Sequence, residues 1–434
     1  MNYKNTYRIL GRDAMICNDT YRTGLNNNDL IIGPSGAGKT RGYVKPNILQ
    51  CSESLIVADT KGSLLSEVGP ALERSGYRIL SLDFKDLDHA CGYNPLDFIR
   101  YDRKNRQYTP QDILTIANTL VPSTSQKDPF WENAARMYLG AMIGYVMECL
   151  PKREHTLKYV VDLYASIQSG DFRRLMNELM QEKPDCFAVN AYRLFLGSNR
   201  SPTTEASILS VLGEKLNGLN FKSALKMYSR RSRIDLSKLG QEKTAVFLTI
   251  SDTDRSMDRL VSLFYTQALQ VLCHSADTRY PDHRLPVPVR FILDDFATNA
   301  VIPDFDNITS VIRSRNISVS IILQSITQLN AIYGAQRAAT ITNNCDNCLY
   351  LGGQDPETAR FISVKANKPV STILGMGLEE TYLFTRGQQP RKVGKFDLRQ
   401  HPRYSQLPES CQFRQAADAA PEHAQQEAKE DCTP

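Results

Sequence analysis

The chain has 434 residues, of which 41% are hydrophobic and 23% charged, and its net charge is +5. This length and apolar content are enough to bury large cores, in two domains or in one domain with an insertion. No apolar run reaches the roughly 18–20 residues of a membrane-spanning helix and the first 28 residues are polar, so this sequence predicts no membrane span and no signal peptide. The ten cysteines lack a disulfide spacing, which argues against a disulfide framework.

The first hundred residues alternate between strand-like and helical segments. Three apolar runs predict strands: Leu30–Ile32, Leu55–Ala58 and Arg78–Leu82. Helical stretches separate them, and this β-α-β order predicts a parallel sheet. Residues 109–233 have a helical period almost throughout. After Thr244 five further runs predict strands: Ala245–Ile250, Arg290–Leu293, Ile317–Leu323, Cys348–Leu351 and Thr381–Thr385.

A phosphate-binding loop follows the first predicted strand directly. Its residues are Gly33-Pro34-Ser35-Gly36-Ala37-Gly38-Lys39-Thr40, the pattern G-x-x-x-x-G-K-[ST]. Glycines let the backbone point its N–H groups at phosphate oxygens, and the following helix adds its positive dipole end. Lys39 can reach the outer phosphates, and Thr40 can hold Mg²⁺ through its hydroxyl. The loop predicts binding of a nucleoside triphosphate, ATP, with Mg²⁺ as cofactor.

A second predicted strand ends in two acidic residues, Asp294 and Asp295. They come at the carboxyl edge of the sheet, where open α/β sheets bind ligands. We expect Asp294 to hold Mg²⁺ through water and Asp295 to orient or deprotonate the attacking water. Asp59, which follows the second predicted strand, is the alternative carboxylate. Cys345 and Cys348 form a lone C-x-x-C, which predicts burial in preference to a zinc site.

The loop and the acid pair lie on opposite sides of the helical stretch. One sheet must contain both, so the helical stretch is expected to be an insertion into a single nucleotide-binding domain. The predicted divisions are residues 1–105 (first part of the nucleotide-binding domain), 106–234 (all-α insertion domain), 235–400 (second part) and 401–434 (disordered acidic tail). Residues 404–434 carry two basic and six acidic side chains, so the remainder is more positive than the total and suits a polyanionic partner.

Between about residues 21 and 398 the chain resembles the type IV secretion coupling proteins, the TraG/TraD-like conjugative DNA-transfer ATPases of the FtsK/HerA superfamily. The matching segments, in order, are Leu25-Asn26-Asn27-Asn28, the phosphate loop, Lys45-Pro46-Asn47, Asp59-Thr60-Lys61-Gly62, Tyr93-Asn94-Pro95, Asp128-Pro129-Phe130-Trp131, Leu293-Asp294-Asp295-Phe296, Leu323-Gln324-Ser325 and Gln328-Leu329. The resemblance implies a RecA-like P-loop NTPase fold with an all-α insertion. It also implies a homo-hexamer that couples ATP hydrolysis to passing single-stranded DNA, with its attached relaxase, to a type IV secretion channel.

The family order places Gln324 at the end of the strand beside the one that bears Asp294. Gln324 can then contact the γ-phosphate or the attacking water, whereas Gln328, one turn later, is expected to be structural. Related motors complete the site with an arginine from the neighbouring subunit. The family spacing makes Arg313 the first choice for that arginine and Arg315 the second, since both precede the strand and lie at its opposite end.

The chain departs from the family at Thr60 and Ser63, where the family often has proline and an acid, and at two further points. The family usually has Glu where this chain has Asp295, and the shorter side chain would slow hydrolysis. The family usually begins with transmembrane helices, so this sequence is either truncated or a variant that meets the cytoplasmic side of the bacterial cell membrane through partners. Besides the DNA-transfer motor, two functions stay open: a nucleotide-gated docking protein with weak hydrolysis, and a double-stranded DNA translocase of the same superfamily.

The helical insertion carries basic clusters that are candidates for DNA or substrate contact, with solvated surface as the alternative. They are Arg173-Arg174, Lys226, Arg230-Arg231 and Arg233.

Overall fold

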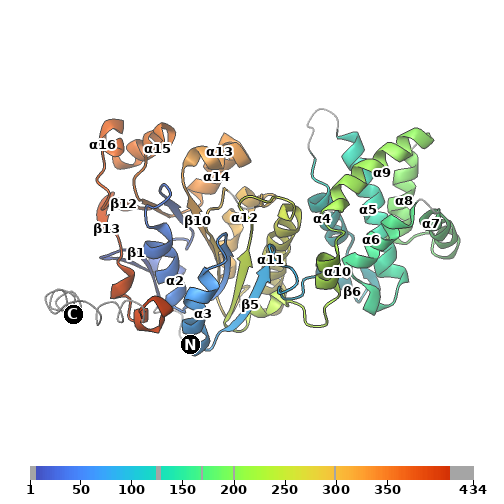
Figure 1. The fold of residues 1–434 in the computed structure, drawn as a ribbon, viewed down its shortest axis with the longest axis horizontal. Coiled ribbons are helices and arrows are strands. Elements are labelled where there is room, and N and C mark those ends of the chain that lie inside the picture. The colour runs from blue at the N-terminus through green and yellow to red at the C-terminus, as the bar shows by residue number, and fades with distance from the viewer. Residues whose placement is uncertain (1–5, 124–128, 168–169, 199–200, 298–299, 411–434) are drawn as a thin grey trace.

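The computed structural model describes residues 6–123, 129–167, 170–198, 201–297 and 300–410. In this part of the chain the largest sheet has the strand order β13-β12-β11-β3-β10-β9-β4-β8-β5 (Figure 1). The strands are β3 (Asp29–Ile32), β4 (Ser54–Asp59), β5 (Arg78–Asp83), β8 (Thr244–Thr249), β9 (Val289–Leu293), β10 (Ile317–Leu323), β11 (Asn347–Tyr350), β12 (Glu380–Thr385) and β13 (Arg391–Gly394). All neighbours from β5 to β11 are parallel, and β12 and β13 extend the sheet antiparallel.

Helices cover both faces of the sheet, which explains why its central strands are apolar on both sides. Alternate residues of one strand enter different cores: Leu30 and Ile32 pack with α11, and Ile31 packs with α2 and α3. The helices beside the sheet are α2 (Lys45–Leu49), α3 (Leu64–Arg74), α11 (Asp258–Arg279), α12 (Phe305–Val311), α13 (Ile326–Tyr333), α14 (Ala335–Asn343), α15 (Pro356–Ala366) and α16 (Val370–Leu374). The predicted α/β class with a mostly parallel sheet is therefore confirmed.

A second group of helices lies at the other end of the molecule, on the right in Figure 1. Its members are α4 (Pro110–Leu120), α5 (Phe130–Cys149), α6 (Leu157–Ala165), α7 (Asp171–Glu182), α8 (Phe187–Ser198), α9 (Pro202–Asn217) and α10 (Lys222–Ser229). The chain leaves the sheet after β5 and returns at β8, its neighbour. The two connecting segments meet where the N–H of Ile234 donates to the carbonyl of Gly92 (2.8 Å). A Cβ on Gly92 would lie 2.6 Å from the carbonyl oxygen of Ser232, so this close approach requires glycine.

Short elements complete the described chain. They are β1 (Tyr7–Gly11), β2 (Ala14–Cys17), α1 (Thr20–Thr23), η2 (Thr40–Val44), η3 (Pro95–Phe98), β6 (Tyr101–Asp102), β7 (Gln107–Tyr108), η4 (Lys152–Glu154), η6 (Leu236–Gly240), η7 (Ile312–Arg315), η8 (Leu398–Gln400) and η9 (Tyr404–Gln406). Within the described ranges, the helices are all too short or too polar to cross a membrane.

The predicted start of the disordered tail at residue 401 is wrong for its first ten residues. Leu407 is buried in the core formed by α2 and α3, and the guanidinium of Arg403 donates to the carbonyl of Leu49 (2.6 Å) at the end of α2. Low apolar content along the tail concealed this segment, which is held largely by polar contacts such as the ion pair of Glu409 with Arg41 (2.6 Å). The remainder of the predicted tail, residues 411–434, and Asp128 of the motif Asp128-Pro129-Phe130-Trp131 lie outside the described residues.

Candidate nucleotide-binding site

The phosphate loop joins β3 to a helix that starts with a π-helical turn, η2, and continues as α2. Three glycines fit their positions for different reasons. The N–H of Gly33 donates to the carbonyl of Leu323 on β10 (3.1 Å), and a Cβ there would lie 3.0 Å from that of Leu351. Gly36 and Gly38 have φ angles of +77° and +89°, the left-handed region that glycine occupies without a steric penalty. The sequence therefore forms the tight turn that the loop pattern requires.

Lys39 folds back onto its own loop. Its Nζ donates to the carbonyl oxygens of Gly33 (2.6 Å) and Pro34 (3.0 Å), and the side chain is buried. Burial lowers the pKa of Lys39 from its usual value of 10.5, and the carboxylates of Asp295 and Asp294 partly offset this effect. To reach a phosphate, the ammonium group must exchange these two carbonyl oxygens for phosphate oxygens.

The acid pair follows β9, two strands away from the loop. The hydroxyl of Thr40 donates to Oδ2 of Asp294 (3.2 Å). The two residues predicted to hold Mg²⁺ are therefore in direct contact. Asp294 is only 8% exposed, and burial, followed by the charge of Asp295, raises its pKa to about 6. Asp295 has a φ of +46° and donates its N–H to Oδ1 of Asp294 (3.0 Å). Aspartate tolerates this left-handed conformation better than most residues.

Gln324 lies at the end of β10, between the strands that carry the loop and the acids. Its Nε2 makes a long hydrogen bond to Oδ1 of Asp295 (3.4 Å). Gln328 instead accepts a hydrogen bond from the backbone N–H of Gln324 (3.4 Å). Its own backbone N–H donates to the hydroxyl of Ser325, the N-cap of α13. Of the two glutamines, Gln324 is therefore the one that contacts an acidic side chain of the candidate site.

The residues present fit a hard divalent cation. The hydroxyl of Thr40 and the carboxylate of Asp294 already approach each other, and oxygen donors of this kind are what Mg²⁺ prefers. The alternative carboxylate, Asp59, is used differently. Its two oxygens accept the N–H groups of Gly62 (2.8 Å) and Leu64 (2.7 Å), so it caps the start of α3.

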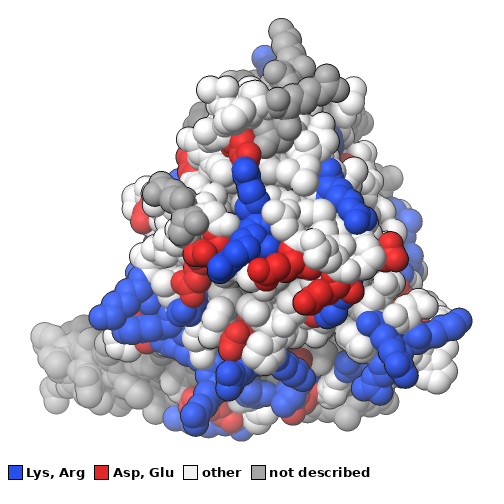
Figure 2. Space-filling view, turned by 90° about the vertical axis from the view of Figure 1, so that its right-hand side faces the viewer, with Lys and Arg blue, Asp and Glu red and all other residues white. Residues whose placement is uncertain are grey.

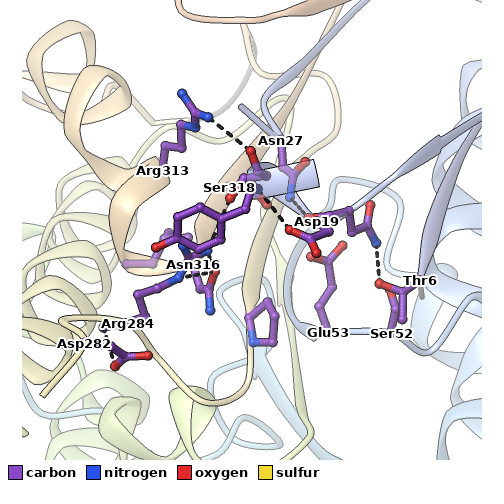
Figure 3. Close-up of a pocket in the computed structure, with 15 residues that line it drawn as sticks. Thr6, Asp19, Asn27, Ser52, Glu53, Asp282, Arg284, Arg313, Asn316 and Ser318 are labelled. Atoms are coloured by element: carbon purple, nitrogen blue, oxygen red, sulfur yellow. Dashed lines mark hydrogen bonds between the residues drawn. The ribbon is translucent and has the colours of Figure 1, made fainter. Parts of the chain in front are cut away.

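Arg313 lies at the amino end of β10, the end opposite the glutamine. It is exposed, and its guanidinium donates to two backbone carbonyl oxygens of the segment around α1. With Arg284, Asn316, Asp19 and Glu53 it lines a cavity of about 470 Å³ (Figure 3). This cavity lies at the amino ends of the strands, whereas the phosphate loop lies at their carboxyl ends.

Arg315 and Arg284 also lie near the amino ends of the strands. Arg315 forms a two-pronged ion pair with Asp277 on α11 (2.8 and 2.9 Å), which occupies it within its own subunit. Arg284 stacks on the ring of Tyr21 (4.4 Å) and donates to Asn316. The sequence analysis missed Arg284, because no local pattern marks a residue whose partners are about 30 and 260 positions away.

The family assignment follows from comparison with known proteins. The model of the family described as Type IV secretory system Conjugative DNA transfer matches residues 6–368. The chain belongs to this family. VirD4 of Rhizobium radiobacter is 26% identical over 340 residues, which make up 77% of this chain and 47% of VirD4. The chain thus spans about half the length of the curated relatives it matches.

Solved structures of conjugative coupling proteins share the fold. The unbound monoclinic form of TrwBdeltaN70 gives a TM-score of 0.66 at 15% identity and covers 92% of this chain and 90% of that one. The plasmid coupling protein TrwB in complex with ADP and Mg²⁺ gives a TM-score of 0.56 at 17% identity and covers 85% of each chain. The predicted family and RecA-like P-loop fold are confirmed.

Most of the basic residues that the sequence suggested for DNA contact in this conjugative family member are engaged within the fold. Ion pairs join Arg173 to Glu205, Arg174 to Asp171, Lys226 to Asp88 and Arg233 to Asp97, and Arg230 donates to the carbonyl oxygens of Leu87 and Asp88. The contacts of Lys226, Arg230 and Arg233 join the end of the helical group to the segment that follows β5, which gives these residues a structural role.

Proposed function

We propose that the chain is the ATP-driven motor of a conjugative DNA-transfer system. In this proposal it recruits relaxase-bound single-stranded DNA and passes it to a type IV secretion channel at the cytoplasmic side of the membrane. The observation that carries the proposal is the grouping of Thr40, Asp294, Asp295 and Gln324 beside a phosphate loop, in a chain of the conjugative DNA transfer family. The solved structure of TrwB in complex with ADP and Mg²⁺ supports the same ligands here.

Each residue of the site has a task in ATP hydrolysis. The loop from Gly33 to Thr40 would hold the phosphates, with Lys39 turned from its loop carbonyls toward them. Thr40 and Asp294 would hold Mg²⁺, which neutralises charge on the phosphate oxygens when it is bound. Asp295 would accept a proton from the attacking water, and Gln324 would hold the carboxylate of Asp295 in position.

The site also needs a positive charge from outside its own subunit. Arg313 lies at the far end of β10 from Gln324, and seven residues of strand separate two points by about 23 Å. It is therefore remote from its own phosphate loop, and to serve a neighbour it would exchange the carbonyl oxygens of Thr20 and Gly24 for the neighbour's phosphates. Head-to-tail contacts of this kind close into rings, and a homo-hexamer is the ring we propose.

DNA-stimulated ATPase activity tests the proposal. The purified chain should hydrolyse ATP faster with single-stranded DNA than without it, and more so than with duplex DNA. Lys39→Ala should abolish turnover while the fold, followed by circular dichroism, survives. Equal stimulation by duplex DNA would favour the double-stranded translocase.

A nucleotide-gated docking protein is the second candidate, and the short carboxylate of Asp295 favours it. In that case the chain would bind ATP tightly, hydrolyse it slowly and show no stimulation by DNA. Measurement of ATP affinity beside turnover separates the two functions.

A further inference from the structure

A short basic β-hairpin stands at the base of the helical group. Strands β6 and β7 pair Tyr101 with Tyr108 and Asp102 with Gln107. The turn between them carries three exposed cations, Arg103, Lys104 and Arg106. Within the described ranges none of these three has an ion-pair partner, in contrast to the basic residues that join the helical group to the segment that follows β5. Their charge is therefore available to an external anion.

The hairpin is rigid enough to present these groups in a fixed arrangement. The carboxylate of Asp102 accepts the backbone N–H groups of Lys104 (2.8 Å) and Asn105 (3.2 Å), which shapes the turn and lowers the pKa of Asp102. At the base, the guanidinium of Arg100 forms a two-pronged ion pair with Asp112 in the first turn of α4 (2.7 and 2.9 Å). A preorganised turn loses less conformational entropy when it binds.

The same hairpin carries two tyrosines, which flank the three cations in the sequence. The rings of Tyr101 and Tyr108 meet edge to face at 5.1 Å, and Tyr108 contacts the ring of His155 at 5.8 Å. Tyr101 is 51% exposed. The segment before His155 adds two more exposed cations, Lys152 and Arg153, the latter beside Glu154.

Figure 2 looks onto the end of the molecule formed by the helical group, and Lys and Arg side chains gather along its lower part. Figure 1 places β6 at the same height, at the foot of that group. The basic hairpin is the segment of residues 101–108.

We propose that the basic hairpin binds single-stranded DNA, with its turn cations on the phosphates and Tyr101 stacked on a base. Cations that follow the backbone beside exposed rings are the combination that single-strand binding requires. An unpaired strand fits better than a duplex, because the bases of a duplex already cover each other's faces. The inference rests on the proposed function, since it assigns the surface that meets the transferred strand.

The test is binding of a fluorescein-labelled thymidine oligonucleotide to the full chain, followed by anisotropy at several salt concentrations. The triple variant Arg103→Ala/Lys104→Ala/Arg106→Ala should weaken binding at least tenfold at low salt. It should also reduce the slope of log affinity against log salt by about 2, at roughly 0.7 per phosphate contact. A control with the same loss of charge, Arg360→Ala/Lys365→Ala/Lys368→Ala on and after α15, should leave both quantities unchanged.

Tyr101 gives a second, charge-free test. Tyr101→Ala should weaken single-strand binding at least fivefold, whereas Tyr101→Phe should keep it, because stacking needs the ring and not the hydroxyl. Neither hairpin variant should alter the basal ATPase rate, since the hairpin lies outside the nucleotide site. An equal loss of duplex binding in Tyr101→Ala would overturn the single-strand assignment.

The remaining outcomes separate this inference from the function on which it rests. If the intact chain binds the oligonucleotide and the triple variant binds it equally well, the hairpin assignment is wrong and the proposed function stands. If the intact chain binds no DNA, both fall. If the triple variant loses binding to phosphatidylserine vesicles but keeps binding to the oligonucleotide, the hairpin is a membrane contact and the inference is overturned.

Discussion

We expect the charge of the buried Asp294 carboxylate to lower the stability of the nucleotide-free protein. Asp294 is 8% exposed, and its pKa of about 6 stands well above the ordinary 3.8. At about 1.4 kcal/mol per pKa unit, ionising this group in the folded chain costs about 3 kcal/mol more than in the unfolded chain. The unfolded chain releases the proton near pH 3.8 and the folded chain near pH 6, so stability falls as pH rises through this window, and the full penalty applies above it.

Asp294→Asn should therefore stabilise the ligand-free protein at neutral pH. The amide keeps the shape but offers one acceptor oxygen, whereas the carboxylate accepts from both the Thr40 hydroxyl and the Asp295 N–H. Loss of one acceptor costs about 1 kcal/mol, which leaves a net gain of about 2 kcal/mol. With an unfolding entropy of roughly 2 cal/mol/K per residue, this gain raises Tm by about 2 °C.

Differential scanning calorimetry from about pH 4 to about pH 8 measures this effect. The stability difference should be positive at neutral pH and should reverse to about −0.5 kcal/mol near pH 4, where folded wild-type Asp294 is uncharged and part of the penalty from the unfolded chain persists. With Mg²⁺ and a non-hydrolysable ATP analogue, the wild type should gain more stability than the variant. Asp252→Asn, at an exposed position, is the control. A variant no more stable than wild type at pH 8, or a gain independent of pH, would refute the reasoning.

Three further predictions concern the site and its support. Asp295→Asn should leave ATP bound and lower kcat by about 10²–10⁴-fold, whereas Asp295→Glu should speed turnover if the short carboxylate limits it; no gain would show that the site is built around aspartate. Arg313→Ala and Lys39→Ala should each be inactive in ATPase assays, and mixed rings should regain part of the activity; full activity of Arg313→Ala alone would exclude the arginine from catalysis. Asp29→Asn should destabilise the chain by about 3–5 kcal/mol in urea unfolding, because it removes the carboxylate paired with the buried guanidinium of Arg8 (2.8 Å) and leaves Arg290 with Glu53 alone.

The parts of the site that were predictable from sequence are those whose residues form a short, continuous sequence pattern. The loop from Gly33 to Thr40 and the pair Asp294 and Asp295 each combine an apolar strand with polar residues at its end, and a parallel sheet places such ends at one edge. The position of Gln324 on the strand beside the one that bears Asp294 followed from the strand order that the family implied, whereas its hydrogen bond to Asp295 was not predicted.

Contacts between residues far apart in the sequence were not predictable. Arg315 pairs with Asp277, 38 positions away, because the folded chain packs η7 and α11 side by side. The basic hairpin is a different case. Three cations between two tyrosines are visible in the sequence, but only the structure shows that they are unpaired among the described residues while the helical arginines are engaged.

The three strands that carry the site are fixed at their other ends by buried polar groups. Asp29 precedes Gly33 by four residues on β3, Arg290 precedes Asp294 by four on β9, and Ser320 precedes Gln324 by four on β10. A spacing of four puts both members on the same face of the strand, about 13 Å apart. The middle residue of each spacing, which lies on the same face of the strand, is isoleucine in all three strands. These isoleucines pack in the core beneath the phosphate-loop helix.

Tyr43, on the phosphate-loop helix, links the buried polar groups of β3 and β10 by hydrogen bonds. Its hydroxyl donates to Asp29 (2.6 Å) and lies 2.7 Å from the hydroxyl of Ser320, which also accepts from Arg290 (3.1 Å). A shift of any one strand along its axis would break these bonds and leave buried charges unpaired, which costs several kcal/mol. An apolar layer would tolerate such sliding better, since dispersion contacts are not directional. We therefore infer that the buried charges keep β3, β9 and β10 in register, so that the loop, the acids and Gln324 meet at the opposite edge. Loss of ATPase activity in Asp29→Asn at temperatures where the variant is still folded would support this role, and full activity there would limit the network to stability alone.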